Sequence, residues 1–442
     1  MSVPSAWPSM RKPVLVSLAG STIEWYDFFV YGSAAALVFN KLFFPVVDSA
    51  AGTLLAFSTF AVGFLIRPVG AALFGNWGDR VGRKPALITA MLLMGAATTA
   101  IGLLPTYSTV GVLAPVLLVL LRLLQGLALG GQWGGSVLLV TENAPPGRRG
   151  FYGSFAQLGV PMALILSNVV LLVVNAVMPS AAFETWGWRL PFLFSIVLIA
   201  VSLYAQSQID ETPAGAAAAS GGRRRSPFVE CLLTHPRQIL LAAGATIVNG
   251  AVYYLVATYM LSFATQSVGV ARSTILTGVL ISAVVSAVTI PAAAALSDRI
   301  GRKRTFLLGA AGLAVWAFPL FLLVQTGSLV LITLALVVAQ AIFSMTYGPA
   351  PALFTEMFDA NVRYSGVSVG YQIGATLGGA FAPIIATALY GAFGSSTPIS
   401  IYMIVVCLVS FLSVALVRQR SGTAPLAEQS GGGVAQVPAA GR

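Results

Sequence analysis

Charged residues are scarce in this sequence. Asp, Glu, Lys and Arg make up 8% of its 442 residues, whereas hydrophobic residues make up 57%. A soluble globular protein carries about 25% charged residues, so this composition excludes a soluble fold and indicates a chain that dissolves in lipid. The apolar runs are long and continuous, and do not alternate with polar residues as in a transmembrane barrel. We therefore expect an all-α membrane protein.

Histidine and cysteine are equally rare. His235 is the one histidine, and the two cysteines are Cys231 and Cys407. A zinc site takes three or four ligands, and the sequence contains no nucleophile elbow or phosphate-binding glycine loop. We therefore expect a chain that is not an enzyme and that holds no metal or cofactor.

The length and the apolar runs predict twelve helical spans, since one span needs roughly 20 apolar residues. We place these spans near residues 14–39, 52–75, 86–104, 110–138, 151–177, 188–207, 238–264, 273–296, 305–325, 328–352, 365–391 and 398–417. With the N-terminus inside, 19 of the 24 basic residues fall in inside segments, and only Lys41, Arg189 and Arg272 fall outside. Because cytoplasmic loops carry the excess of Lys and Arg, we expect an inner-membrane protein with both termini cytoplasmic. The same distribution argues against a nucleic-acid partner, despite a net charge of +11.

The two halves of the chain repeat one another. A D-R-x-G-R-K loop begins at Asp79 and again at Asp298, 219 residues later. A Glu precedes an Arg by seven residues at Glu142 and again at Glu356, 214 residues later. Such repeats around a midplane site are a transporter architecture. We predict six-helix halves at 1–207 and 238–420, a cytoplasmic linker at 208–237, a disordered tail at 421–442, and function as a monomer.

The repeated loops combine acids with arginines at helix ends, where they can form charge-assisted bonds. If these bonds form in one conformation and break in another, the loops act as a latch. The alternative is a topology signal alone, which explains the arginines but not the aspartates or the repetition. The predicted gating residues are Asp79, Arg80, Arg83, Glu142, Arg149, Asp298, Arg299, Arg302, Glu356 and Arg363.

Four charged residues fall inside predicted spans, namely Glu24, Asp27, Arg67 and Arg122. A charge at the bilayer centre costs about 2.5–3.5 kcal/mol on insertion scales, so these groups must be paired or hydrated. Glu24 and Asp27 are three residues apart and share a helix face, and we expect Trp25 on the opposite, wall side. We hypothesise that Asp27 or Glu24 carries a proton. A static ion pair is the alternative.

Polar residues in several spans predict a cavity lined from both halves. Each of them alone is also explained by helix–helix packing, and Arg122 by permanent pairing with an acid. The predicted substrate-binding residues are Arg122, Gln125, Gln132, Tyr31, Arg67, Gln157, Asn249, Tyr253, Tyr347, Tyr371 and Gln372.

Several motifs resemble those of a known family. The stretches DRVGRK at 79–84 and RLLQG at 122–126 resemble signatures of the major facilitator superfamily. The stretches EWYDF at 24–28, RPVG at 67–70 and WGWRLPF at 186–192 are similar to its metabolite:proton symporters. That family includes shikimate, α-ketoglutarate, citrate and proline/betaine permeases. The chain departs from it at Gln132, where the family usually has Glu.

The resemblance implies a secondary transporter that imports a small metabolite with protons. Two intramembrane arginines favour a carboxylate substrate. Glu24 and Asp27 can neutralise these arginines internally, so zwitterions such as proline or betaine remain an alternative. A proton-independent facilitator and an exporter of the same fold remain alternatives, although span five lacks the Gly-Pro-rich signature expected of drug:proton antiporters. The expected partners are the substrate, protons and the lipid bilayer.

Overall fold

The computed structural model describes residues 7–47, 49–81, 83–130, 133, 136–137, 140–141, 144–145, 147–207, 232–358 and 363–417. These residues form helices and contain no strand. The N-terminal group of helices comprises α1 (Trp7–Ala34), η1 (Ala35–Phe39), α2 (Asn40–Phe43), α3 (Ser49–Leu65), α4 (Arg67–Val81), α5 (Arg83–Leu103), α6 (Tyr107–Val110), α7 (Leu113–Leu129), α9 (Arg149–Val177), α10 (Ser180–Thr185), η2 (Gly187–Arg189) and α11 (Leu190–Ser207).

The C-terminal group continues the same pattern after residue 231. It comprises α14 (Pro236–Tyr254), η3 (Leu255–Tyr259), α15 (Met260–Ser262), η4 (Phe263–Ser267), α16 (Arg272–Ile300), α17 (Arg302–Gln325), α18 (Leu329–Tyr347), α19 (Ala350–Met357), α20 (Arg363–Ala375), η5 (Thr376–Ala380), α21 (Ala382–Phe393) and α22 (Thr397–Ala415). The segments η1, η3, η4 and η5 are π-helical, and η2 is a 3-10 turn.

Eight helices in the described part of the chain are long and apolar enough to cross a membrane. Three further apolar helices, Ile88–Leu103, Leu113–Leu129 and Gly187–Val201, are shorter. Helix α1 is not among the eight, and it carries both Glu24 and Asp27. The all-helical prediction is confirmed.

Three expected spans are interrupted, and one of them is the span predicted at 365–391, which breaks at Phe381 between η5 and α21. The span predicted at 52–75 breaks at Ile66 into α3 and α4, and the span predicted at 328–352 divides into α18 and α19. Proline cannot donate an amide to the carbonyl four residues before it, and its ring crowds that carbonyl. Pro68 and Pro383 lie two residues after the breaks at Ile66 and Phe381, and Pro349 and Pro351 lie in and just after the break at 348–349, so proline accounts for all three.

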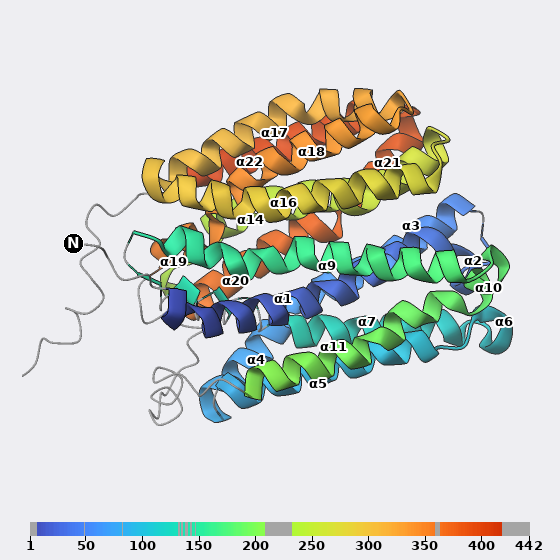
Figure 1. Cartoon of the computed structure of the whole chain (residues 1–442), viewed down its shortest axis with the longest axis horizontal. Helices are drawn as coiled ribbons and strands as arrows, with labels where there is room; N and C mark the ends of the chain where they lie inside the picture. The colour runs from blue at the N-terminus through green and yellow to red at the C-terminus, as the bar shows by residue number, and fades with distance from the viewer. Residues whose placement is uncertain are drawn as a thin grey trace, which may run out of the picture.

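The two groups of helices lie against each other lengthwise. In Figure 1 the blue-to-green helices of the N-terminal group occupy the lower part of the picture, and most yellow-to-red helices occupy the upper part. Helix α1 packs against α9 and α11, and α9 packs along α16, which joins the two groups. Further contacts between the groups join α3 to η5 and α4 to α20.

Candidate functional site

A small cavity lies between the two groups. Its volume is about 20 Å³, which is room for roughly one water molecule. Seven of its twelve lining residues are aromatic, and it is lined by Trp25, Phe64, Val160, Thr246, Asn249, Gly250, Tyr253, Tyr254, Phe343, Tyr347, Tyr371 and Ala375. A metabolite would need this cavity to widen.

Three polar atoms of the cavity lining have no hydrogen-bond partner within the described residues. They are Trp25 Nε1, Asn249 Nδ2 and Tyr253 Oη. A buried donor without a partner is costly, so these atoms are ready to bind a ligand or water that offers acceptors.

The structure divides the predicted substrate-binding residues into two sets. Asn249, Tyr253, Tyr347 and Tyr371 line the cavity. Gln132 lies outside the described residues. The others are buried but do not line the cavity, and they are Tyr31, Arg67, Arg122, Gln125, Gln157 and Gln372.

The expectation that Trp25 lies on a wall facing away from the cavity is wrong, because Trp25 lines the cavity while Glu24 and Asp27 do not. Every residue from 23 to 31 is buried. Helix α1 is enclosed by protein over this stretch, so periodicity alone does not identify its cavity side.

Asp27 belongs to a network within the N-terminal group. Its Oδ2 accepts a hydrogen bond from Thr98 Oγ1 (2.7 Å) and its Oδ1 accepts one from Ser195 Oγ (2.8 Å). Gln125 Nε2 donates to Thr98 Oγ1 (2.5 Å), and Arg122 Nη1 donates to Gln125 Oε1 (2.8 Å). Asp27 is therefore linked to Arg122 through two neutral side chains rather than by the direct ion pair that the sequence left open.

The two buried arginines lie against aromatic faces. The Arg122 guanidinium is 3.6 Å from the centre of the Tyr31 ring, and Tyr31 Oη lies 2.5 Å from Thr59 Oγ1. The Arg67 guanidinium lies 4.0 Å from the Phe64 ring centre and 5.5 Å from that of Trp25, which lines the cavity. Cation–π contact of this kind offsets part of the cost of a desolvated cation.

Sequence reasoning missed Thr98, Ser195 and Thr59. Each is one of several Ser or Thr residues in a largely apolar helix, where such residues commonly bond their own backbone. Only proximity to Asp27 or Tyr31 distinguishes them, and the sequence carries no signal of that proximity.

Two glutamines connect the groups beside the cavity. Gln157 Nε2 donates to the Tyr347 carbonyl (3.3 Å), and Gln372 Nε2 donates to the Gly130 carbonyl (3.3 Å). Trp133 Nε1 donates to Gln157 Oε1 (3.1 Å), and the Trp133 ring stacks on Tyr371 with centres 3.6 Å apart. These contacts tie the groups together next to two residues that line the cavity.

A third hydrogen bond between the two groups is accepted by a backbone carbonyl that cannot receive the usual helical hydrogen bond, because a proline stands four residues later. Thr376 Oγ1 donates to the Phe64 carbonyl (3.0 Å), and Pro68, four residues after Phe64, cannot supply an amide there. Replacing Thr376 by valine keeps the shape and removes the donor. We expect this change to lower the stability of the purified transmembrane bundle by about 1 kcal/mol, seen as a lower thermal unfolding midpoint.

Thr376→Ser is the matched control, because it keeps the hydroxyl, and we expect its unfolding midpoint to stay near that of the original chain. Equal midpoints for the valine and serine variants would show that this hydrogen bond does not hold the groups together.

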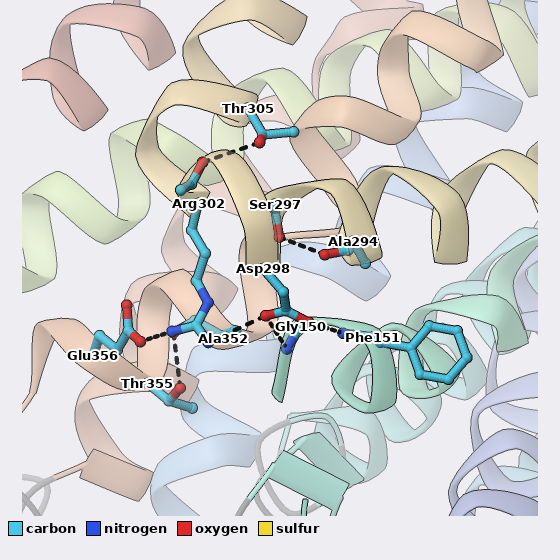
Figure 2. A network of polar contacts seen from close by, with 11 residues as sticks. Gly150, Phe151, Ala294, Ser297, Asp298, Arg302, Thr305, Ala352, Thr355 and Glu356 are labelled. Atoms are coloured by element: carbon cyan, nitrogen blue, oxygen red, sulfur yellow. Dashed lines mark hydrogen bonds and ion pairs between the residues drawn. The ribbon is translucent and has the colours of Figure 1, made fainter. Parts of the chain in front are cut away.

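A charged cluster joins the groups at the end of the bundle where α1 begins, which we call the Asp298 end. Asp298 accepts hydrogen bonds from the backbone amides of Gly150 (3.0 Å) and Phe151 (2.9 Å), the first turn of α9. Arg302 donates to Asp298 (3.4 Å) and forms an ion pair with Glu356. Figure 2 shows Asp298 directed at the α9 amides and Arg302 lying between both acids. A carboxylate at a helix N-terminus is stabilised by the amides and the helix dipole.

The other predicted gating residues either do not take part in the described hydrogen bonds and ion pairs of the charged cluster at the Asp298 end or have side chains outside the described part of the chain. Arg299 is exposed and Arg149 is half-buried. Glu142 lies outside the described residues. The side chains of Asp79, Arg80, Arg83 and Arg363 are likewise not described. At the opposite end of the bundle, Lys41 Nζ and Glu184 Oε1 form an exposed ion pair (2.8 Å).

Comparison with known proteins decides the family. The model of the Major Facilitator Superfamily matches residues 18–372 and 243–439. The chain belongs to the major facilitator superfamily. Its members are transporters and not enzymes, in agreement with the expectation from the sequence.

The resemblance to metabolite transporters of this superfamily is confirmed. The chain is 40% identical to the shikimate transporter of Escherichia coli K12, over 92% of this chain and 94% of the relative. It is 36% identical to the inner membrane metabolite transport protein YhjE of the same strain, over 93% and 94%. It is 31% identical to the proline/betaine transporter of that strain, over 91% and 82%.

Among solved structures, the proton:xylose symporter XylE bound to 6-bromo-6-deoxy-D-glucose superposes on this transporter with a TM-score of 0.74. The match covers 93% of this chain and 96% of that chain at 18% identity. At this identity the likeness concerns the fold.

Proposed function

We propose that this transporter imports a small carboxylate by proton symport through alternating access. In this proposal it crosses the inner membrane twelve times as a monomer, in two six-helix halves at 1–207 and 238–420, joined by a cytoplasmic linker at 208–237. Both termini and the Asp298 end face the cytoplasm. The predicted tail at 421–442 lies outside the described residues.

The proposal depends most on the environment of Asp27. This carboxyl is 1% exposed, and its described hydrogen bonds come from two neutral hydroxyl groups. An ionised carboxylate inside a membrane is expensive, and a carboxyl can remove that charge by taking up a proton. A buried acid that can exchange a proton is what proton coupling requires.

Glu24 remains the second proposed proton carrier. It is buried one turn before Asp27 on α1, and the Arg67 charge acts on it. The charge of Arg67 opposes protonation of Glu24, and the charge of Arg122 opposes protonation of Asp27. Asp27 differs in its two hydroxyl partners, because a hydroxyl can donate to a carboxylate and accept from a protonated carboxyl. We therefore favour Asp27.

A carboxylate substrate is supported by the polar atoms near the cavity. Trp25 Nε1 and Asn249 Nδ2 are donors only, and Arg67 lies against Trp25. Arginine provides a planar fork that suits carboxylates. The names of the relatives, a shikimate transporter and a proline/betaine transporter, are compatible with a substrate that bears a carboxylate.

Alternating access requires that the cavity open to one side at a time. In the present conformation the cavity is too small for a metabolite, and the Asp298 end is joined across the two groups. We infer an occluded state, from which opening at either end would separate the two halves.

Uptake by proteoliposomes tests the proposal. Labelled shikimate, α-ketoglutarate, citrate and proline are offered with and without an inward proton gradient. Accumulation of one acid that collapses when the gradient is dissipated supports proton symport. Equilibration without accumulation indicates a facilitator, and flux that an opposite gradient drives only outward indicates an exporter. Under the facilitator outcome, Gln132→Glu is the first variant to measure.

A further inference from the structure

We propose that Thr98 is the positioning residue that allows the buried Asp27 carboxyl to exist both with and without its proton, and that its hydroxyl passes the protonation state on toward Arg122. The inference rests on the proposed role of Asp27 as the proton carrier. It adds a residue from α5 that does not line the cavity and whose described contact with an ionisable side chain is the hydrogen bond to Asp27.

The hydrogen bonds between Arg122 and Asp27 all have the same direction. Arg122 donates to Gln125, Gln125 donates to Thr98, and Thr98 donates to the carboxylate. A guanidinium only donates and an ionised carboxylate only accepts, so this direction fits Asp27 in its ionised form. Aligned bonds of this kind polarise one another in a low-dielectric interior, which links the charge at one end to the charge at the other.

The Thr98 hydroxyl has two acceptors for its single proton. Its Oγ1 lies 2.7 Å from Asp27 Oδ2 and 2.9 Å from the carbonyl oxygen of Met94, one turn earlier on α5. A hydroxyl carries one donor and two lone pairs. Rotation about one bond therefore redirects the proton from the carboxylate to the backbone without moving a helix.

The two protonation states can be balanced atom by atom. In the ionised state Thr98 donates to Oδ2 of Asp27 and accepts from Gln125. When a proton binds Oδ2, a new O–H bond forms on Asp27 and donates to Thr98 Oγ1. Thr98 then turns its own proton, which never leaves it, to the Met94 carbonyl. In this state both Thr98 lone pairs are used, and no donor is left without an acceptor.

Ser195 fixes which carboxyl oxygen takes the proton. Its Oγ lies 2.8 Å from Asp27 Oδ1. As a donor to Oδ1, Ser195 can keep the same hydrogen bond in both states, because the carbonyl oxygen of a protonated carboxyl still accepts. The proton is therefore assigned to Oδ2, on the side of Thr98.

Helix α1 and the elements near it carry charged and titratable residues besides Asp27 and Arg122. On α1 itself these are Arg11, Lys12, Glu24, Tyr26 and Tyr31, and Tyr26 Oη donates to the Pro191 carbonyl (2.8 Å). The remaining ones on neighbouring elements are Arg83 and Lys84 in the first turn of α5, Arg149 and Tyr152 in the first turn of α9, Tyr204 near the end of α11, Arg67 of α4, Tyr253 and Tyr254 of α14, and Tyr259 of η3. Arg122 is the cation whose charge acts on Asp27, and Gln125 and Thr98 lie between the two.

The test is the pH profile of uptake by the full chain in proteoliposomes. Thr98→Val removes the hydroxyl and keeps the shape. Since the lost bond favours the ionised carboxylate, we expect the midpoint of the profile to rise by about one pH unit, and gradient-driven accumulation to fall. Thr98→Ser keeps the hydroxyl, and we expect its midpoint to match the original chain. A merely structural role would lower activity at every pH and leave the midpoint unchanged.

The outcomes separate this inference from the proposed function. If Asp27→Asn still accumulates substrate, the proton-carrier proposal fails. If Asp27→Asn loses accumulation while the Thr98→Val midpoint equals that of the original chain, only the role of Thr98 is overturned. A midpoint that rises equally in the serine variant also overturns it. Should the valine variant not fold, Thr98→Cys replaces it, because a thiol is a weak donor, and an unchanged midpoint there has the same meaning.

Discussion

Replacing Asp27 by asparagine is expected to abolish accumulation of substrate against its gradient while leaving downhill exchange in place. Asparagine has nearly the same shape and still offers an acceptor to Thr98 or Ser195, so the network around it can persist. The side-chain amide of asparagine cannot take up or release a proton at physiological pH. The variant should therefore bind and translocate substrate without coupling it to protons.

The expected size of the effect follows from the driving force. For one proton per substrate and no membrane potential, an inward gradient of one pH unit supports about tenfold accumulation. The Asp27→Asn variant should reach a ratio of about 1 under the same gradient. Uptake of the labelled substrate into proteoliposomes, sampled to the plateau, measures this ratio.

Glu24→Gln is the matched control, since it neutralises a second buried acid on the same helix. We expect it to keep most of the accumulation, because Asp27, with two hydroxyl partners that can hold either protonation state, is the favoured carrier. Loss in the Glu24 variant alone would assign the proton to Glu24. Full gradient-driven uptake by both variants would rule out both acids as the carrier.

Replacing Asp298 by asparagine is expected to open the Asp298 end of the bundle. The change removes the negative charge that accepts from Gly150, Phe151 and Arg302. Hydrogen bonds to charged groups contribute roughly 1.5–3 kcal/mol, so we expect a shift of about tenfold or more toward conformations open at this end. The remaining Arg302–Glu356 pair joins α17 to α19, both in the C-terminal group, and cannot replace the lost contact with α9.

The measurement is the rate at which a thiol reagent labels Ser154→Cys on α9. Ser154 is fully buried near this end, in the turn after Phe151. The two native cysteines, Cys231 and Cys407, are first replaced. Asp298→Asn should raise the labelling rate about tenfold.

Arg299→Gln serves as the control for this experiment, because it changes an exposed charge in the same helical turn. We expect its labelling rate to stay within about twofold of the original chain, as exposed charges contribute little. An equal rise in both variants would mean that net charge, and not the bonds of Asp298 to α9, controls the opening.

The residues of the site differ in how far the sequence could predict them. The sequence alone identifies Glu24, Asp27, Arg67 and Arg122, because a charged residue inside an apolar span is costly and is therefore expected to be paired, hydrated or functional. Polarity within predicted spans also indicates Asn249, Tyr253, Tyr347 and Tyr371, and these four residues line the cavity. The same criterion selected Gln157 and Gln372, which instead bond backbone carbonyls of the other group. Polarity marks a buried residue as bonded without telling whether its partner is substrate or protein.

The sequence by itself determined that the chain lies in a lipid bilayer, that it is helical, which family it belongs to, and that its loops repeat. These properties can be predicted from the sequence because composition, apolar runs and motifs depend only on the order of residues along the chain. Only the tertiary structure decided that Thr98 and Ser195 bind Asp27, that Trp25 lines the cavity, and that Asp298 caps α9 from the other group. Each of these contacts joins helices that are distant in sequence. The type of a residue on one helix does not predict which residue of another helix it will contact. Packing of the whole bundle selects that neighbour, and with it the partner of the buried charge.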